Sequence, residues 1–589
     1  MAVRKKIGLI LSALFVPFLF FITELYNFKN LRSLCGFVFG HPGSALLGLL
    51  LVGLVTAFCV AAVRRVWVGA LISGSFFFLM AIIHFLKVAL NGDPFVPWDL
   101  TMVGSLDKLV SFVKPDFPWW GWILPLLLAG YIVALGYCGT ALPKGRLGAR
   151  MAVLAAVPTL LVGFIGGGQP NFMRFGMTYM DAALQSSNYQ ANGLVGAFYL
   201  NIATMNVEQP ENYTAENIER LMAAHTDTTG KTPDIIVVLC ESFWDVRKLQ
   251  GTRFSSDPLA RYDALCAKNN TYNGTLYSMA IGGGTVRTEF GVLTGLSSQY
   301  LPTGASPYIY PKKDIPTHVS FLKEQGYTTL ALHPYDKKFY SRQTGYPFIG
   351  FDAFYGKEEV EEMVEVTYQR GYVSDDSFVD ALIYQLEQNE DRKTLLWGIS
   401  MENHQTYYPL EETPEITVQN EALSEDLIGA VTTYTQGVAH SAAALEKLVT
   451  YVENRSKDTL LVFFGDHLPT LGGNHASYAA TGMFDGPAGD LAQAKVMYGT
   501  PFMIYANYEL ESDRPTAGLE ISDYNLLPLA FEIGGVSRSG YMNWQLEQMK
   551  TFPYYSQLLD FDTTPEKAAF SANHQLFTYD RLVGNQYSK

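Results

Sequence analysis

The sequence predicts an N-terminal α-helical membrane domain of several spans, followed by an α/β domain whose mostly parallel sheet is covered by helices. Two observations predict this fold class. Residues 1–167 are overwhelmingly apolar, whereas the remainder mixes Gly, Asp, Glu, Tyr and Thr throughout. From Pro233 onward, short β-branched runs alternate with helical patterns, as in strands joined by helical crossovers. A chain of 589 residues is also too long for one hydrophobic core, so at least two domains are expected.

The apolar part contains five stretches that approach or exceed the bilayer-spanning length of roughly 20 residues. They are Ile7–Tyr26, Ser44–Val63, Val68–Leu90, Trp119–Cys138 and Met151–Gly166. Basic residues precede the first stretch, join the second to the third and join the fourth to the fifth, a bias that is typical of cytoplasmic loops. An odd number of spans then places everything after about residue 167 outside. We therefore expect a multi-pass protein of the plasma membrane whose second domain is extracytoplasmic.

The distribution of apolar, polar and helical stretches along the chain predicts four segments. We predict a transmembrane domain of about five helices over 1–167, an extracytoplasmic helical linker over 168–232, the α/β domain over 233–545, and a C-terminal tail packed on it over 546–589. The formal net charge is −14, and no basic patch large enough for nucleic acid is present, so nucleic-acid binding is set aside. Only Cys240 and Cys266 of the five cysteines follow the apolar part, so a disulfide framework is not indicated.

Five short apolar runs in the α/β domain predict buried strands. They are Asp234–Leu239, Thr328–Leu332, Thr394–Ile399, Thr459–Phe464 and Pro501–Tyr505. Helical patterns lie between them, over His318–Glu324, Asp376–Glu387 and Leu427–Glu453. Continuous apolar strands with helical crossovers favour a parallel sheet that is buried on both faces. In such sheets the functional residues lie at the carboxyl ends of the strands.

Polar residues follow the first four predicted strands along the chain. These residues are Glu241, His333, His404 and the pair Asp466-His467. Carboxylate and imidazole groups together suit a divalent cation such as Zn²⁺ or Mn²⁺. An isolated Asp-His pair is usually structural, but Glu241 at the end of another strand offers a third ligand. The pattern therefore predicts a metal site at this edge of the sheet.

A glycine-rich turn, Gly282-Gly283-Gly284, precedes Thr285 and a predicted helix. Three glycines remove side chains where the backbone must approach another group closely. One interpretation is that Thr285 is the N-cap of the helix, a position that threonine commonly takes. The other is that Thr285 is a nucleophile whose hydroxyl loses its proton through metal coordination. The two interpretations are compatible, and the sequence leaves both open.

Taken together, these motifs resemble the lipoteichoic acid synthases, phosphoglycerol transferases of the sulfatase and alkaline phosphatase superfamily. The resemblance is carried by Glu-Ser-Phe after the first strand, the glycine turn with Thr and then Glu-Phe, the Phe-aromatic-x-Arg segment at Phe339–Arg342, an Asn-His pair and Gly-Asp-His. It implies a sulfatase-like catalytic domain. It also implies metal-dependent transfer of phosphoglycerol from phosphatidylglycerol to a cell-envelope acceptor, either lipoteichoic acid or a glycan, through a phosphothreonine-type intermediate.

The resemblance also assigns roles to individual residues. Thr285 matches the nucleophile, and Glu241, Thr285, Asp466 and His467 match the ligands of one divalent metal. Mn²⁺ is the expected ion, with Mg²⁺ and Zn²⁺ as alternatives. The expected partners are a phospholipid donor, an envelope glycan or glycolipid acceptor and the membrane.

Four further residues match the substrate-binding positions of the synthases. His404 matches the residue that contacts the transferred phosphoglycerol, and Arg342 matches the arginine that grips it. Tyr340 stands where the synthases usually carry Trp, and Asp336 lies one place from a position where some of them carry Asp. A guanidinium group suits phosphate better than an ammonium group does, because it can donate two parallel hydrogen bonds.

Other functions are compatible with the same scaffold. One alternative is a phosphoethanolamine transferase, another phosphodiesterase or a sulfatase-like hydrolase. Phosphoethanolamine transferases typically have disulfide-rich outer domains, which two cysteines do not support, and no Cys-x-Pro-x-Arg motif of formylglycine sulfatases occurs. A second alternative is a non-catalytic membrane scaffold. The complete set of Glu241, Thr285, Asp466 and His467 argues against it.

Overall fold

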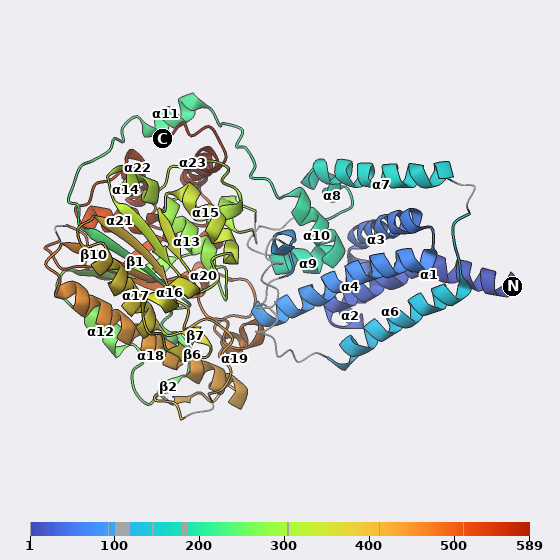
Figure 1. The fold of residues 1–589 in the computed structure, drawn as a ribbon, viewed down its shortest axis with the longest axis horizontal. Coiled ribbons are helices and arrows are strands. Elements are labelled where there is room, and N and C mark those ends of the chain that lie inside the picture. Colours follow the sequence, from blue (N-terminus) through green and yellow to red (C-terminus); the bar gives the residue numbers. More distant parts are fainter. Residues whose placement is uncertain are drawn as a thin grey trace. The chain divides into compact units, whose positions relative to one another are not determined.

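A computed structural model describes residues 2–91, 94–100, 118–143, 147–178, 185–302, 305–410, 413–510 and 512–589. The described chain forms two compact units, the first ending at Asn206 and the second continuing from Val207 (Figure 1). The boundary between them falls inside the segment 168–232 that the sequence analysis treats as a linker. The division into four segments otherwise stays a prediction.

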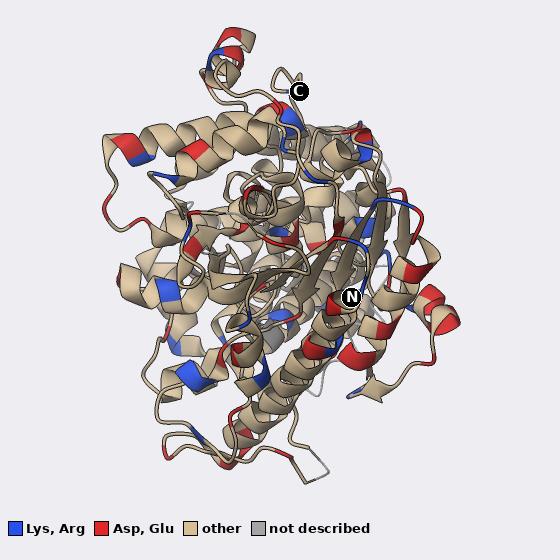
Figure 2. Ribbon diagram, turned by 90° about the vertical axis from the view of Figure 1, so that its left-hand side faces the viewer, with Lys and Arg blue, Asp and Glu red and all other residues tan. Residues whose placement is uncertain are grey.

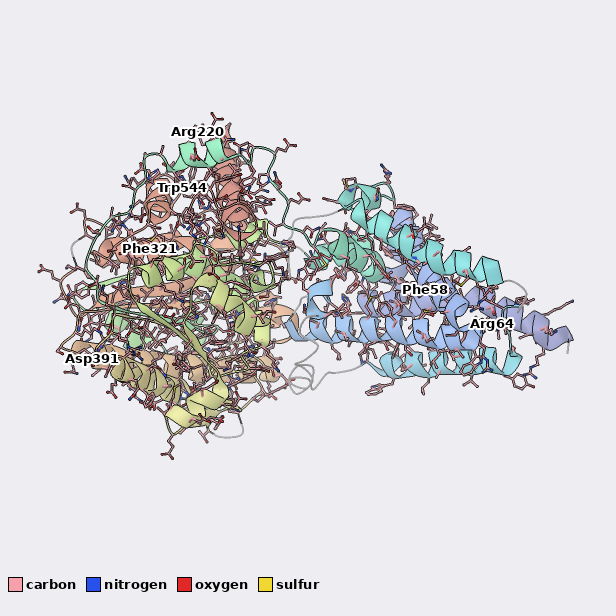
Figure 3. All side chains as sticks on the ribbon, turned by 45° about the horizontal axis from the view of Figure 1, so that its top comes forward. Phe58, Arg64, Arg220, Phe321, Asp391 and Trp544 are labelled. Carbon is pink, nitrogen blue, oxygen red and sulfur yellow. The ribbon has the colours of Figure 1, made fainter. Side chains whose placement is uncertain are left out.

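The described part of the first unit is built from helices. They are α1 (Ala2–Phe28), α2 (Leu31–Gly40), α3 (Pro42–Val63), α4 (Val66–Asn91), α6 (Trp119–Cys138), α7 (Leu147–Gly166), α8 (Gln169–Met173), α9 (Gln185–Asn192) and α10 (Leu194–Ala203). Five of these helices, α1, α3, α4, α6 and α7, are long and apolar enough to cross a membrane. Arg64 and Arg65 make the two-residue connection between α3 and α4, and Figure 3 labels Arg64 there.

A buried carboxylate fastens two of these helices together. Glu24 of α1 is fully buried and accepts hydrogen bonds from the backbone amides of Leu194 at 2.7 Å and Val195 at 3.0 Å. These amides open α10, where the first turn of a helix has unpaired donors and a partial positive charge. Gly193 precedes them with a φ of 74°, and a Cβ there would lie 3.0 Å from the Glu24 carboxylate oxygens. The carboxylate therefore caps α10.

The second unit contains an eight-stranded sheet in the order β12-β3-β11-β10-β1-β8-β4-β5. All neighbouring strands in it are parallel except that β11 runs antiparallel to both β10 and β3. The strands are β1 (Asp234–Cys240), β3 (Thr271–Tyr277), β4 (Thr328–Leu332), β5 (Ala353–Tyr355), β8 (Thr394–Ile399), β10 (Thr459–Gly465), β11 (Gly499–Ala506) and β12 (Leu519–Ser522). Two small antiparallel pairs join β2 (Arg253–Phe254) to β9 (Val418–Gln419) and β6 (Tyr368–Gln369) to β7 (Tyr372–Val373).

Helices cover both faces of this sheet (Figure 1). They are α11 (Ala215–Met222), α12 (Ala260–Cys266), α13 (Thr285–Thr294), α14 (His318–Glu324), α15 (Arg342–Ile349), α16 (Lys357–Met363), α17 (Asp375–Gln388), α18 (Glu425–Glu453), α19 (Ala476–Ala480), α20 (Leu491–Tyr498), α21 (Leu526–Ile533), α22 (Gly540–Met549) and α23 (Pro565–Leu582). Short 3₁₀ helices are η3 (Val246–Lys248), η4 (Ser298–Tyr300), η5 (Pro307–Ile309), η6 (Phe339–Ser341), η7 (Gly473–His475), η8 (Asp523–Asn525) and η9 (Gln557–Leu559).

Alternation along β1 divides the core into two layers. Ile235, Val237 and Leu239 pack with residues of α13, α14 and α21 to α23, whereas Ile236 and Val238 pack with residues of α12, α17 and α18. A period of two is what a strand buried on both faces requires. The predicted fold class, with five apolar helices followed by a mainly parallel sheet covered by helices, is confirmed.

The C-terminal region joins the core of the second unit. α22 runs through the predicted boundary after residue 545, and its Trp544, labelled in Figure 3, packs against Phe577 of α23 with ring centroids 4.5 Å apart and the rings tilted by 54°. Both rings are buried in the same apolar cluster. Figure 2 shows Lys and Arg interspersed with Asp and Glu along the ribbon of the second unit.

Candidate active site

The sheet register brings the three predicted side-chain metal ligands together. β1 and β10 pair in parallel, with Cys240 opposite Gly465, so the residues that follow them emerge side by side. A Cβ at Gly465 would lie 2.0 Å from the carbonyl oxygen of Phe243, which explains why glycine ends β10. Ligand atoms of Glu241, Asp466 and His467 all lie within 4.8 Å of one another, and all three residues are buried.

Thr285 lies beside this group. Its Oγ1 is 3.2 Å from Glu241 Oε2 and 3.4 Å from His467 Nε2. The glycines before it have φ values of 66°, 153° and 87°, a backbone conformation that side chains rarely adopt. Gly284 is the N-cap residue of α13, and Thr285 is the first residue inside the helix. The interpretation of Thr285 as an N-cap is therefore wrong, and its hydroxyl is directed to the candidate metal ligands instead.

Hydrogen bonds orient the ligands but leave one oxygen without a donor. Oδ1 of Asp466 accepts from the amides of Ser242 at 2.8 Å and His467 at 2.9 Å. Oδ2 of Asp466 is buried, and no donor among the described residues bonds to it. It lies 3.2 Å from Nε2 of His467, whose Nδ1 is 2.9 Å from the Leu468 carbonyl. A carbonyl oxygen can only accept a hydrogen bond, so Nδ1 carries the ring hydrogen and donates it in that bond. Nε2 then presents a lone pair to the carboxylates.

This donor set fits a cation. Two carboxylates and an imidazole lone pair facing one another repel unless a positive charge lies among them. Burial raises the pKa of Asp466, an effect that His467 opposes and the charge of Glu241 reinforces. Oxygen and nitrogen donors of this kind suit Mn²⁺, Zn²⁺ or, more weakly, Mg²⁺. The residues present therefore fit the divalent metal that the sequence predicts.

Arg342, at the start of α15, is held by the helix that carries Thr285. Its Nη2 and Nε donate to Oε2 of Glu289 at 2.7 Å and 2.9 Å, and both side chains are almost fully buried. Glu289 lies four residues after Thr285 in α13, which places both on one face of the helix. Tyr308 and Tyr346 also donate to Glu289, at 2.8 Å and 2.5 Å.

The third guanidinium nitrogen of Arg342, Nη1, is left available for a ligand. Nη1 of Arg342 is buried and has no acceptor among the described residues. Burial opposes the charge, but the Glu289 carboxylate and the neighbouring tyrosines raise the pKa of Arg342. A buried guanidinium with one unpaired nitrogen is suited to an anion such as phosphate. The sequence analysis did not single out Glu289 as its partner, although the four-residue spacing from Thr285 could have suggested one.

The other predicted substrate contacts have different surroundings. His404 is partly buried in the loop after β8, with Nδ1 2.6 Å from the Gln405 carbonyl, and burial lowers its pKa, although Glu241 opposes this. The Tyr340 ring lies 5.2 Å from the Arg342 guanidinium. Asp336 accepts a hydrogen bond from the amide of Lys338 at 2.9 Å. His333 is buried, with Nδ1 3.1 Å from the Ile399 carbonyl. Roles in substrate binding stay predictions for His404, Tyr340 and Asp336.

We expect Arg342→Lys to lower kcat/KM for phosphate-ester cleavage by roughly 100-fold, because an ammonium cannot bond Glu289 and a phosphate with a fixed fork. Steady-state kinetics of the full-length protein would measure the change. Arg247→Lys is the matched control, since Arg247 also bonds carboxylates, those of Asp245 and Asp263, but is 31% exposed. Equal losses in the two variants would contradict a role for Arg342 at the site.

Comparison with known proteins agrees with this geometry. Residues 233–536 match the sulfatase family, and the chain belongs to that family. It is 29% identical over 439 residues to a putative cyclic β-1,2-glucan modification protein of Rhizobium meliloti, a match that covers 72% of this chain and 66% of that protein. It is 30% identical over 280 residues to the capsular polysaccharide biosynthesis protein RkpI of the same species, covering 44% and 46%. The chain thus spans just under two thirds of the first relative and about half of the second.

A solved structure shares the fold. The phosphoglycerol transferase GacH of Streptococcus pyogenes, determined with sn-glycerol-1-phosphate, superposes with a TM-score of 0.53 at 22% identity. The match covers 64% of this chain and 96% of that chain. At this level of identity the similarity concerns the fold alone, and it agrees with a sulfatase-like domain.

Proposed function

We propose that this protein transfers phosphoglycerol from phosphatidylglycerol to a cell-envelope acceptor, with Thr285 as the nucleophile. The observation that carries the proposal is the position of the Thr285 hydroxyl, 3.2 Å from Glu241 Oε2 and 3.4 Å from His467 Nε2, on the helix that also holds Arg342 through Glu289. The acceptor is a glycan or a lipoteichoic-acid-type chain. A relative named for modifying cyclic β-1,2-glucan supports the glycan.

Glu241, Thr285, Asp466 and His467 would hold the metal, which we propose to be Mn²⁺ with Mg²⁺ and Zn²⁺ as alternatives. Such an ion lowers the pKa of the threonine hydroxyl and neutralises charge on the phosphate. The Thr285 oxygen attacks phosphorus, the bond to diacylglycerol breaks, and phosphoglycerol remains on the threonine. Nη1 of Arg342 donates to the phosphate oxygens, and Tyr340 and Asp336 contact the glycerol. His404 accepts the proton that Thr285 loses, passes it to the leaving oxygen of diacylglycerol, and later accepts a proton from the attacking hydroxyl of the acceptor, which returns to the Thr285 oxygen as the phosphothreonine bond breaks.

The membrane arrangement belongs to the same proposal. We propose that the five apolar helices span the plasma membrane with the basic connections in the cytoplasm, so that the catalytic unit lies outside; the length and apolar character of these helices support this arrangement. Phosphatidylglycerol in the outer leaflet is then the donor, and the acceptor is an envelope polymer or glycolipid.

Intact-mass measurement of the full-length protein in phosphatidylglycerol nanodiscs with Mn²⁺ tests the proposal. We expect a mass gain of one phosphoglycerol that maps to the peptide carrying Thr285, together with release of diacylglycerol. Diacylglycerol release without the adduct would indicate rapid hydrolysis of the intermediate. Neither product, with metal bound, would contradict the proposal, and an adduct formed only in phosphatidylethanolamine nanodiscs would favour a phosphoethanolamine transferase.

A further inference from the structure

A small hairpin lies against the loop that carries His404. β6 and β7 pair antiparallel and are joined by Arg370 and Gly371, whose φ values are 51° and 88°. Two consecutive residues with positive φ form the tight turn that suits a two-residue hairpin. Arg370 is an unusual choice for such a turn, because residues with a Cβ rarely adopt positive φ. Its side chain gives the reason.

Arg370 binds three carbonyl groups of one loop. Nη1 donates to the Thr406 carbonyl at 3.1 Å, and Nη2 donates to the carbonyls of His404, at 3.1 Å, and Glu402. The guanidinium also lies over the rings of Tyr407 and Tyr372, 5.3 Å and 5.9 Å from their centroids. Carbonyls at alternate positions that turn towards one point need a shared donor. Arg370 therefore sets the backbone conformation of Glu402–Thr406.

Tyr372 acts on the imidazole itself. Its hydroxyl is 3.2 Å from Nδ1 of His404 and 3.0 Å from the Gln405 carbonyl, and Nδ1 is 2.6 Å from the same carbonyl. An Nδ1–H that donates to a carbonyl places the lone pair of the neutral ring on Nε2. The Tyr372 hydroxyl beside Nδ1 limits rotation of the ring about its bond to the chain.

The His404 loop also forms a hydrogen bond with the glycine turn that precedes Thr285. The side chain of Gln405 donates to the carbonyl of Gly282 at 3.1 Å, three residues before Thr285. Oε2 of Glu402 accepts from the amide of Asp375, which follows β7, and Oε1 is 2.6 Å from Nδ1 of His440. The hairpin, the His404 loop and the glycine turn thus form one hydrogen-bonded chain.

We propose that Arg370 and Tyr372 are positioning residues for His404, which hold its loop and select the tautomer whose unprotonated Nε2 accepts a proton and passes it on. This inference rests on the proposed function, since it concerns the proton transfer assigned to His404. Neither residue touches the reacting atoms in this scheme. Removing either one displaces the imidazole without removing a ligand of the metal.

A double-mutant cycle tests the inference in the full-length protein. We expect Arg370→Met, which keeps an apolar stem against Tyr407, to lower kcat for diacylglycerol release by about 10- to 100-fold with KM nearly unchanged, because misplacement by an ångström costs this much. In a His404→Ala background the same substitution should change kcat by less than about twofold, since coupled residues are not additive. Equal effects in the two backgrounds would overturn the inference. Arg538→Met is the matched control, because Arg538 also donates hydrogen bonds, to the side chain of Asn543 and the carbonyl of Phe531, but neither belongs to the His404 loop.

Amide hydrogen exchange tests whether Arg370 holds the His404 loop, and it does not depend on an activity measurement. We expect amide exchange in the peptide covering residues 402–407 to become about tenfold faster in Arg370→Met and unchanged in Arg538→Met, because local opening follows the loss of hydrogen bonds. Tyr372→Phe should lower kcat and speed the exchange of this peptide less than Arg370→Met does, because it removes one hydrogen bond to a loop carbonyl, that of Gln405, rather than three. Unaltered exchange in Arg370→Met would overturn the inference. A wild type that cannot use phosphatidylglycerol contradicts the proposed function alone, because the exchange result stands separately.

Discussion

Thr285→Ala is expected to lower the rate of diacylglycerol release from phosphatidylglycerol by roughly four orders of magnitude or more, as removal of a nucleophile does in other two-step transferases and hydrolases. The reason is local. Oγ1 of Thr285 is the hydroxyl oxygen that lies beside both Glu241 and His467 at the start of α13. Radiolabelled lipid in nanodiscs, followed by extraction of the diacylglycerol, would measure the loss.

Two variants on the same helix make this result specific. Thr285→Ser keeps a hydroxyl at the same atom and should retain measurable activity. Thr294→Ala removes a hydroxyl that donates to the Phe290 carbonyl of its own helix at 2.6 Å and accepts from the amide of Leu296 at 3.1 Å, and it should stay within about threefold of the wild type. Full activity in Thr285→Ala would exclude the threonine as nucleophile.

Asp466→Asn is expected to remove the response to metal. In the wild type, Mn²⁺ at a hundred times its Kd should raise the free energy of unfolding by about 2.7 kcal/mol. The variant should show no such rise and should lose activity by about a thousandfold, because an amide replaces the charged oxygen that a cation needs. Oδ2 of Asp466 is buried, and none of the described residues donates a hydrogen bond to it. Chemical denaturation with and without Mn²⁺ would measure both proteins.

Asp523→Asn is the matched control for this experiment. Asp523 is also a buried carboxylate whose Oδ2 has no donor among the described residues, while Oδ1 accepts from the amide of Tyr524 at 2.8 Å. Burial raises its pKa to about 8, although Tyr524 and Arg287 oppose the shift. It is therefore mostly protonated at pH 7, and asparagine is close to isosteric. The control should keep the stabilisation by Mn²⁺, and its loss there too would show that the metal response is not specific to Asp466.

Much of the site follows from the sequence because strand ends in a parallel sheet converge. Apolar runs identified β1 and β10, and their in-register ends place Glu241 beside Asp466. An apolar run does not show whether its strand runs parallel or antiparallel to its neighbours. The antiparallel orientation of β11 could therefore not be predicted from its composition. β5 and β12 have three and four residues, too few for a pattern to distinguish them from loops.

Long-range polar contacts account for the rest. Nothing local to Arg342 indicates that Glu289 will take two of its nitrogens, because the two residues are 53 positions apart. The β6–β7 hairpin was equally unpredictable, since its strands have two residues each and Arg370 occupies a turn position where Asn or Asp is usual. The capping of α10 by Glu24 joins residues 170 positions apart.

The strand order also governs when this site can come into being during synthesis. β1 is made early, yet it lies between β10 and β8, and Thr394 of β8 bonds Asp234 across 160 residues of chain. Until those strands emerge, a strand whose residues after Asp234 are all apolar has no partner, which slows folding and favours aggregation. Thr285 is 182 residues ahead of His467. A growing chain therefore completes the candidate metal site only after residue 467 has been made, and every truncation before that residue lacks part of the site.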